Sequence, residues 1–176
     1  MNESLSFDAA PEVGRGTAGR LLYRVTQGFA LGGGLILLVL VGMSLISVIG
    51  RKLFATPVHG DIELMEIGAA MAIAAFLPLC ELRGQHIKVD AFTLKLPVRA
   101  QAWLDACAHF LCLVAALVLA WRTSLQVLES REYGEVSTLL SVPLWIPLLL
   151  IVPSLLLLAV TAGARTFHCL AREQRP

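Results

Sequence analysis

The chain alternates between long uncharged stretches and short clusters of charged residues. Four stretches contain no Asp, Glu, Lys or Arg: residues 25–50, 67–80, 106–121 and 136–164. They hold 26, 14, 16 and 29 residues, respectively. A transmembrane helix needs about 20 mostly apolar residues to cross the roughly 30 Å hydrocarbon core of a bilayer. The first and last stretches meet this length on their own, so each predicts a membrane-spanning helix.

The two shorter stretches reach spanning length if the charged residues at their ends lie near the lipid headgroups. Residues 64–82 then form one span with Glu66 and Glu81 close to its ends, and residues 102–121 form another with Asp105 near one end. A carboxylate near the interface costs far less than one at mid-depth. The pattern therefore predicts four helices, at residues 27–49, 62–82, 101–122 and 143–164.

Composition supports an all-α integral membrane protein with one domain. Of the 176 residues, 57% are hydrophobic and only 15% are charged, against about 25% charged in an average soluble domain. No long polar segment remains to build a soluble catalytic domain. We expect a single four-helix membrane domain at residues 21–166, between a flexible cytoplasmic tail at 1–20 and a short cytoplasmic tail at 167–176. A net charge of +1 gives no argument for nucleic acid as a partner.

The distribution of basic residues predicts the orientation of the spans. Ten lie in the two tails and the middle loop: Arg15, Arg20, Arg24, Arg83, Lys88, Lys95, Arg99, Arg165, Arg172 and Arg175. The other two loops hold four: Arg51, Lys52, Arg122 and Arg131. Those two loops also hold six acids: Asp61, Glu63, Glu66, Glu129, Glu132 and Glu135. The positive-inside rule therefore places both termini in the cytoplasm.

The predicted second helix begins with acidic residues. Asp61 is expected to cap the helix, and Glu63 and Glu66 would face the positive end of the helix dipole. Glu66 lies a turn deeper, and three roles stay open for it. It can pair with Arg51 or Lys52, bond to a partner subunit, or reach the membrane interface.

His109 is the histidine that lies within a predicted span. Asp105 is four residues before it and therefore on the same helical face. This pair is compatible with a proton relay, with a haem or metal ligand, or with a polar pair satisfied inside the bundle. The four cysteines form no CxxC pair, which favours small buried apolar side chains over a metal site or a redox relay.

Small residues recur at four-residue spacing, as in Gly28 with Gly32 and Gly68 with Ala72. This spacing lets another helix approach closely. In contrast, no Asp, Glu, Lys or Arg lies near the centre of any predicted span. An ion or proton pathway usually needs such groups, or unwound backbone, around the midplane. A supporting membrane subunit therefore fits better than an autonomous pump.

Two segments carry a resemblance to a known family. One is the run Arg-Gly-Gln-His-Ile-Lys-Val-Asp at residues 83–90. The other is the Ser-rich turn that leads into Pro-Leu-Trp at residues 137–145. Together with the acidic start of the second helix, they resemble the small membrane subunits of TRAP (tripartite ATP-independent periplasmic) transporters, the DctQ type. The resemblance covers about residues 20–165.

The resemblance implies a three-component system for uptake of an organic acid across a bacterial inner membrane. A periplasmic solute-binding protein would deliver the substrate, and a large permease subunit would carry it with the sodium gradient. The small subunit would be a multi-pass scaffold that braces the large one and helps to dock the binding protein. It would not be an enzyme and would hold no cofactor. Membrane lipids would contact an interfacial segment between the second and third helices.

On this basis we expect no catalytic, substrate-binding or metal-binding residue in the chain. The candidate residues for assembly and structure are Glu66, Arg83, Gly84, His86, Asp90, Pro143 and Trp145. Two alternative functions stay open: a small membrane redox or haem protein, and a self-sufficient four-helix channel.

Overall fold

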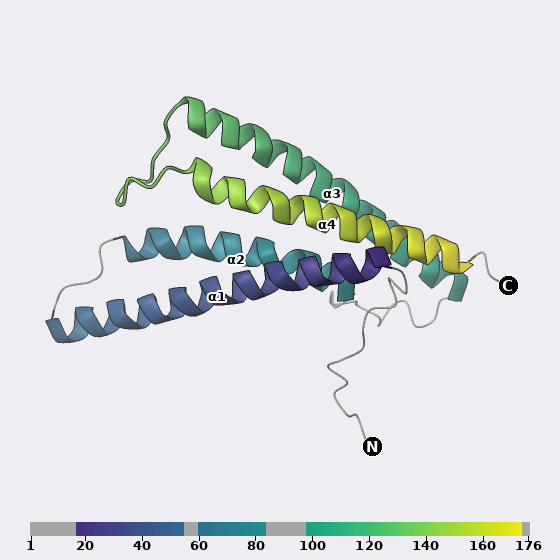
Figure 1. Ribbon diagram of the computed structural model, residues 1–176, viewed down its shortest axis with the longest axis horizontal. Coiled ribbons are helices and arrows are strands. Elements are labelled where there is room, and N and C mark those ends of the chain that lie inside the picture. Colours follow the sequence, from purple (N-terminus) through teal and green to yellow (C-terminus); the bar gives the residue numbers. More distant parts are fainter. Residues whose placement is uncertain (1–16, 55–59, 84–97, 174–176) are drawn as a thin grey trace, which may run out of the picture.

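The computed structural model describes residues 17–54, 60–83 and 98–173 as a bundle of helices (Figure 1). The elements are α1 (Thr17–Phe54), α2 (Asp61–Arg83), α3 (Val98–Glu132) and α4 (Trp145–Glu173). All four are long and apolar enough to cross a membrane. The predicted all-α membrane fold with four spans is therefore confirmed.

The helices extend further than the uncharged stretches. α1 begins at Thr17 instead of residue 27, and α3 continues to Glu132 instead of residue 122. Hydropathy marks the part of a helix that lipid covers, whereas the backbone hydrogen bonds continue into the headgroup region. The start of α4 differs in the other direction. Pro143 forms a bridge with Val136, so α4 begins after it, at Trp145.

The four helices form two antiparallel hairpins, α1 with α2 and α3 with α4, that join where α2 packs against α4 (Figure 1). The first residues of α1 and the last residues of α4 lie at the same end, which we call the terminal end. The opposite end carries the start of α2 and the connection 133–144, and we call it the loop end. That connection folds back towards the start of α2.

Small residues form the closest contact between the first two helices. Gly33 of α1 packs against α2, where an added Cβ would lie 3.0 Å from the Cβ of Ala75 and 3.1 Å from the carbonyl oxygen of Ala72. Gly68 also lies close to α1: an added Cβ would lie 2.8 Å from the end of the Leu40 side chain, which would have to shift. The expectation that small residues allow close helix approach is met here, with α1 as the neighbour of Gly68.

Most large apolar side chains along α1 and α3 point away from the bundle and are exposed, as lipid-facing residues of a membrane helix are. The interior is small. Among the described residues, Ala116 on α3 forms a cluster of buried apolar side chains with Leu158 and Ala159 on α4. Because this apolar interior is limited, the polar contacts between helices become important for fixing their positions.

Candidate functional site

The start of α2 is a tightly specified turn at the loop end. The carbonyl of Gly60 accepts the first helical hydrogen bond, from the N–H of Leu64 at 3.0 Å. Gly60 has a φ of 74°, and an added Cβ there would lie 2.5 Å from Leu140. Gly60 is therefore the N-cap residue, one position before the expected Asp61. Asp61 is the first helical residue, and its Oδ1 accepts the N–H of Ile62 at 2.8 Å.

The second carboxylate oxygen of Asp61 ties α1 to α2. Oδ2 accepts the hydroxyl of Ser47 at 2.5 Å and a guanidinium N–H of Arg51 at 3.4 Å. Ser47 is buried, whereas Arg51 is exposed. Arg51 therefore pairs with Asp61, which argues against one of the alternatives left open for Glu66. Glu66 makes no hydrogen bond or ion pair with another described residue.

Glu63 binds the connection between α3 and α4. Its carboxylate accepts the hydroxyls of Ser137 at 2.9 Å and Thr138 at 3.1 Å. It also accepts the backbone N–H groups of Leu139 at 3.2 Å and Leu140 at 3.0 Å. Because four donors converge on one carboxylate, Glu63 fixes the connection over the start of α2. This is a more specific role than the helix-dipole contact predicted for it.

The connection also has internal support. The N–H of Ser137 donates to the carbonyl of Val142 at 2.9 Å, and the Ser137 hydroxyl accepts the N–H of Val142 at 3.2 Å. At its start, the hydroxyl of Ser130 donates to Glu135 at 2.6 Å. Pro143 closes the connection through its bridge, and Trp145 opens α4. Both candidate residues therefore shape the entry into α4.

Glu66 lies beside this assembly, in a cleft of about 290 Å³ between α2, α3 and α4. Gln126, Ser130 and Glu135 also line the cleft. The side chain of Glu66 is exposed. Of the roles predicted for Glu66, the contact with a partner subunit and the position at the membrane interface are both compatible with this place.

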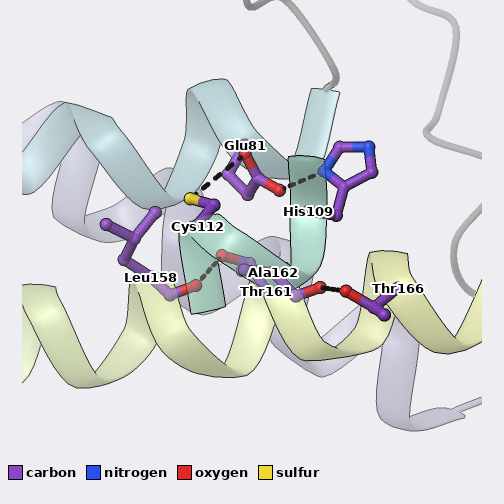
Figure 2. A network of polar contacts seen from close by, with 7 residues as sticks. All are labelled: Glu81, His109, Cys112, Leu158, Thr161, Ala162 and Thr166. Atoms are coloured by element: carbon purple, nitrogen blue, oxygen red, sulfur yellow. Dashed lines mark hydrogen bonds and ion pairs between the residues drawn. The ribbon is translucent and has the colours of Figure 1, made fainter. Parts of the chain in front are cut away.

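A second polar cluster lies nearer the terminal end, where Glu81 projects from α2 towards α3 (Figure 2). Its Oε1 lies 2.6 Å from Nδ1 of His109, and its Oε2 accepts the thiol of Cys112 at 3.9 Å. The side chains of Glu81 and His109 are 1% and 10% exposed. The backbones of α2 and α3 have no close contact of their own. This pair therefore links the two hairpins directly.

Glu81 lies in the last turn of α2, near the end of the span as expected, and its side chain is buried beside His109 and Cys112 of α3. His109 is satisfied at Nδ1 inside the bundle by Glu81 on another helix. Within the described residues, no group of three or more His, Cys, Asp or Glu side chains is arranged to hold a metal ion.

Arg83 ties the end of α2 to the start of α1. Its guanidinium donates to the hydroxyl oxygen of Tyr23 at 3.2 Å. The remaining candidates of this segment, Gly84, His86 and Asp90, lie outside the described residues. The assembly role predicted for them stays a prediction.

Sequence reasoning missed two functional contacts, those of Glu63 and of Glu81. Glu63 is 74 residues from Ser137, and Glu81 is 28 residues from His109. The sequence offered one chemical signal for these contacts. Glu63, Glu81 and His109 lie next to apolar runs, and a carboxylate or an imidazole that enters the bundle needs a polar partner.

One comparison with known proteins identifies a family. A family model described as "Tripartite ATP-independent periplasmic transporters, DctQ component" matches residues 40–172. No curated protein and no solved structure matches the chain. The matched region contains both polar clusters, from Ser47 to Ser137 at the loop end and from Glu81 to Cys112 near the terminal end.

Proposed function

Since this chain belongs to the DctQ components of tripartite ATP-independent periplasmic transporters, and so is a small membrane subunit of such a transporter, we propose that it braces the large permease subunit. The four apolar helices make it a multi-pass inner-membrane protein. A transporter component of this kind is not known as an enzyme. The bracing role rests on the way in which its helices are held together.

The observation that carries the proposal is the location of the polar contacts. Asp61 holds α1 to α2, Glu63 holds α2 to the connection 133–144, and Glu81 holds α2 to α3. Interhelical hydrogen bonds in a membrane fix the register of helices that lipid alone would let slide. The uncharged stretches between these contacts offer no carboxylate or cation to a moving substrate. Such a molecule is suited to be a fixed support.

In this proposal the loop end faces the periplasm and both termini lie in the cytoplasm. The ten basic residues of the tails and the middle loop support that orientation. The connection 133–144 then faces the solute-binding protein. Tyr133, Val136 and Leu139 are all exposed on it, and they supply apolar contact area for docking.

The partner subunit, in the same proposal, carries the organic acid and uses the sodium gradient. This chain itself supplies no cofactor and no substrate site. The experiment is reconstitution of the large permease subunit and the solute-binding protein in liposomes, with and without this chain. We expect sodium-driven uptake of the organic acid to require the chain and the two membrane subunits to co-purify. Full uptake without the chain, or a failure to co-purify, would overturn the proposal.

A further inference from the structure

A long apolar groove runs between α1 and α4, which barely contact each other. α2 forms its floor, and its volume is about 520 Å³. From α1 it is lined by side chains at Val25, Gly28, Phe29, Gly32, Gly33 and Ile36. Across the groove, Leu150 and Ser154 of α4 complete the wall. The groove therefore presents small residues on one side and a hydroxyl on the other.

The glycines of this groove fall into two kinds. Gly33 is explained within the chain, because an added Cβ would press on Ala72 and Ala75. At Gly28 and Gly32, an added Cβ would meet no atom within 4 Å. Glycine inside a helix is less favourable than alanine because it has more backbone freedom to lose on folding. Packing inside this chain therefore gives no reason for glycine at positions 28 and 32.

Ser154 supplies an independent observation. The residue is only 3% exposed, yet its hydroxyl makes no hydrogen bond with any other described residue. In the same protein, the hydroxyl of Ser124 donates to the carbonyl of Ala120 at 2.7 Å, as expected for a serine in a membrane helix. Ser154 lines the groove, and a hydroxyl without a partner in such an apolar place is costly in lipid. The hydroxyl of Ser154 therefore calls for a polar partner from outside the chain.

We propose that this groove receives a transmembrane helix of the large permease subunit. The backbone of that helix packs against Gly28 and Gly32, and a carbonyl or side-chain acceptor on it takes the hydroxyl of Ser154. A lipid acyl chain also fits an apolar groove, but it has no hydrogen-bonding group for Ser154. The inference rests on the proposed function, because it names the surface through which this chain contacts the large subunit.

The test is co-purification of the tagged chain with the large permease subunit in mild detergent. Gly32→Leu and Gly28→Leu place a side chain in the groove from positions where the Cβ itself meets no atom of this chain within 4 Å. We expect each to lower the recovered large subunit by roughly tenfold, because close helix approach depends on small residues. Gly34→Leu is the matched control. An added Cβ at Gly34 also meets nothing within 4 Å, and Gly34 does not line the groove.

Ser154→Ala tests the hydrogen bond separately. We expect it to lower recovery by about threefold, the size of an average interhelical hydrogen bond in a membrane. Helical circular dichroism and a single elution peak confirm that each variant folds. If a leucine variant loses helicity, Gly32→Ala provides the same comparison with a smaller side chain.

The outcomes separate this inference from the proposed function. If the unmodified chain does not bind the large subunit, the proposed function fails. If it binds, but Gly32→Leu and Gly34→Leu recover the large subunit equally, the groove is not the contact surface and only this inference is overturned. The inference also fails if Gly32→Leu abolishes pairing between two differently tagged copies, or releases bound phospholipid, while the large subunit is still recovered in full.

Discussion

Glu81 and His109 form a buried pair between α2 and α3. Glu81 is 1% exposed on its side chain and lies within hydrogen-bond distance of both His109 and Cys112 (Figure 2). Burying such groups is costly unless each has a partner. The pair therefore specifies one relative position of α2 and α3, and loss of either member removes the contact between Oε1 of Glu81 and Nδ1 of His109.

Replacing one member of this pair should destabilise the bundle strongly. We expect His109→Leu or Glu81→Leu to lower the free energy of unfolding by about 3 kcal/mol, because each removes one side of a buried pair. The double variant Glu81→Leu with His109→Leu should be much less destabilised than the sum of the two single variants. Unfolding of the detergent-solubilised protein in denaturant measures this. Additive effects would show that the two side chains act independently.

Glu63 differs from Glu81 because its carboxylate accepts hydrogen bonds from backbone N–H groups as well as from side-chain hydroxyls. Glu63→Ala removes the acceptor for Ser137, Thr138, Leu139 and Leu140. We expect faster proteolytic cleavage within 133–144 and a lower melting temperature, since a loop released from its contacts becomes accessible. Glu66→Ala is the control, because Glu66 makes no hydrogen bond with another described residue. Equal cleavage of the two variants would contradict the role given to Glu63.

At the scale of elements, the contact between α1 and α2 depends on the absence of side chains. Gly33 lies against the backbone of Ala72 and the side chain of Ala75, and backbone has little freedom to move aside. The contact is therefore sensitive to the addition of even a few carbon atoms. It is also independent of the charged contacts at the helix ends.

Gly33→Val should separate α1 from α2 and destabilise the protein by about 2 kcal/mol, as overpacking of a close contact does. Gly42→Val lies on the same helix, where an added Cβ meets no atom within 4 Å, and it should change stability far less. Thermal unfolding followed by circular dichroism compares the two variants. Similar melting temperatures would show that the α1–α2 contact tolerates a larger side chain.

The sequence predicted the number and order of these elements because lipid imposes a minimum apolar length on each span. It did not predict their ends, as at Thr17 and Glu132, since helices continue through headgroups and water. It also placed the N-cap at Asp61, one residue late, because the left-handed turn at Gly60 depends on the connection that folds over it. Contacts across the bundle, such as Glu63 with Ser137, follow from packing that no local pattern encodes.

At the scale of the whole molecule, the polar contacts are divided between its two ends. Asp61 and Glu63 fix the loop end, whereas Arg83 with Tyr23 and Glu81 with His109 fix the half nearer the terminal end. Contacts at both ends restrain the helices relative to one another, which suits the bracing role that we propose. The bundle held in this way is one body that presents different surfaces at its two ends.

The orientation of that body is open to direct measurement. A cysteine at Leu139, introduced into a chain whose native cysteines are replaced with serine, should react with a membrane-impermeant maleimide in intact spheroplasts. Leu139 is 64% exposed at the loop end, which the positive-inside rule places outside the cytoplasm. A cysteine at Gln174 should react only after the membrane is opened. The reverse pattern would place the connection 133–144 in the cytoplasm, where it could not contact a periplasmic solute-binding protein.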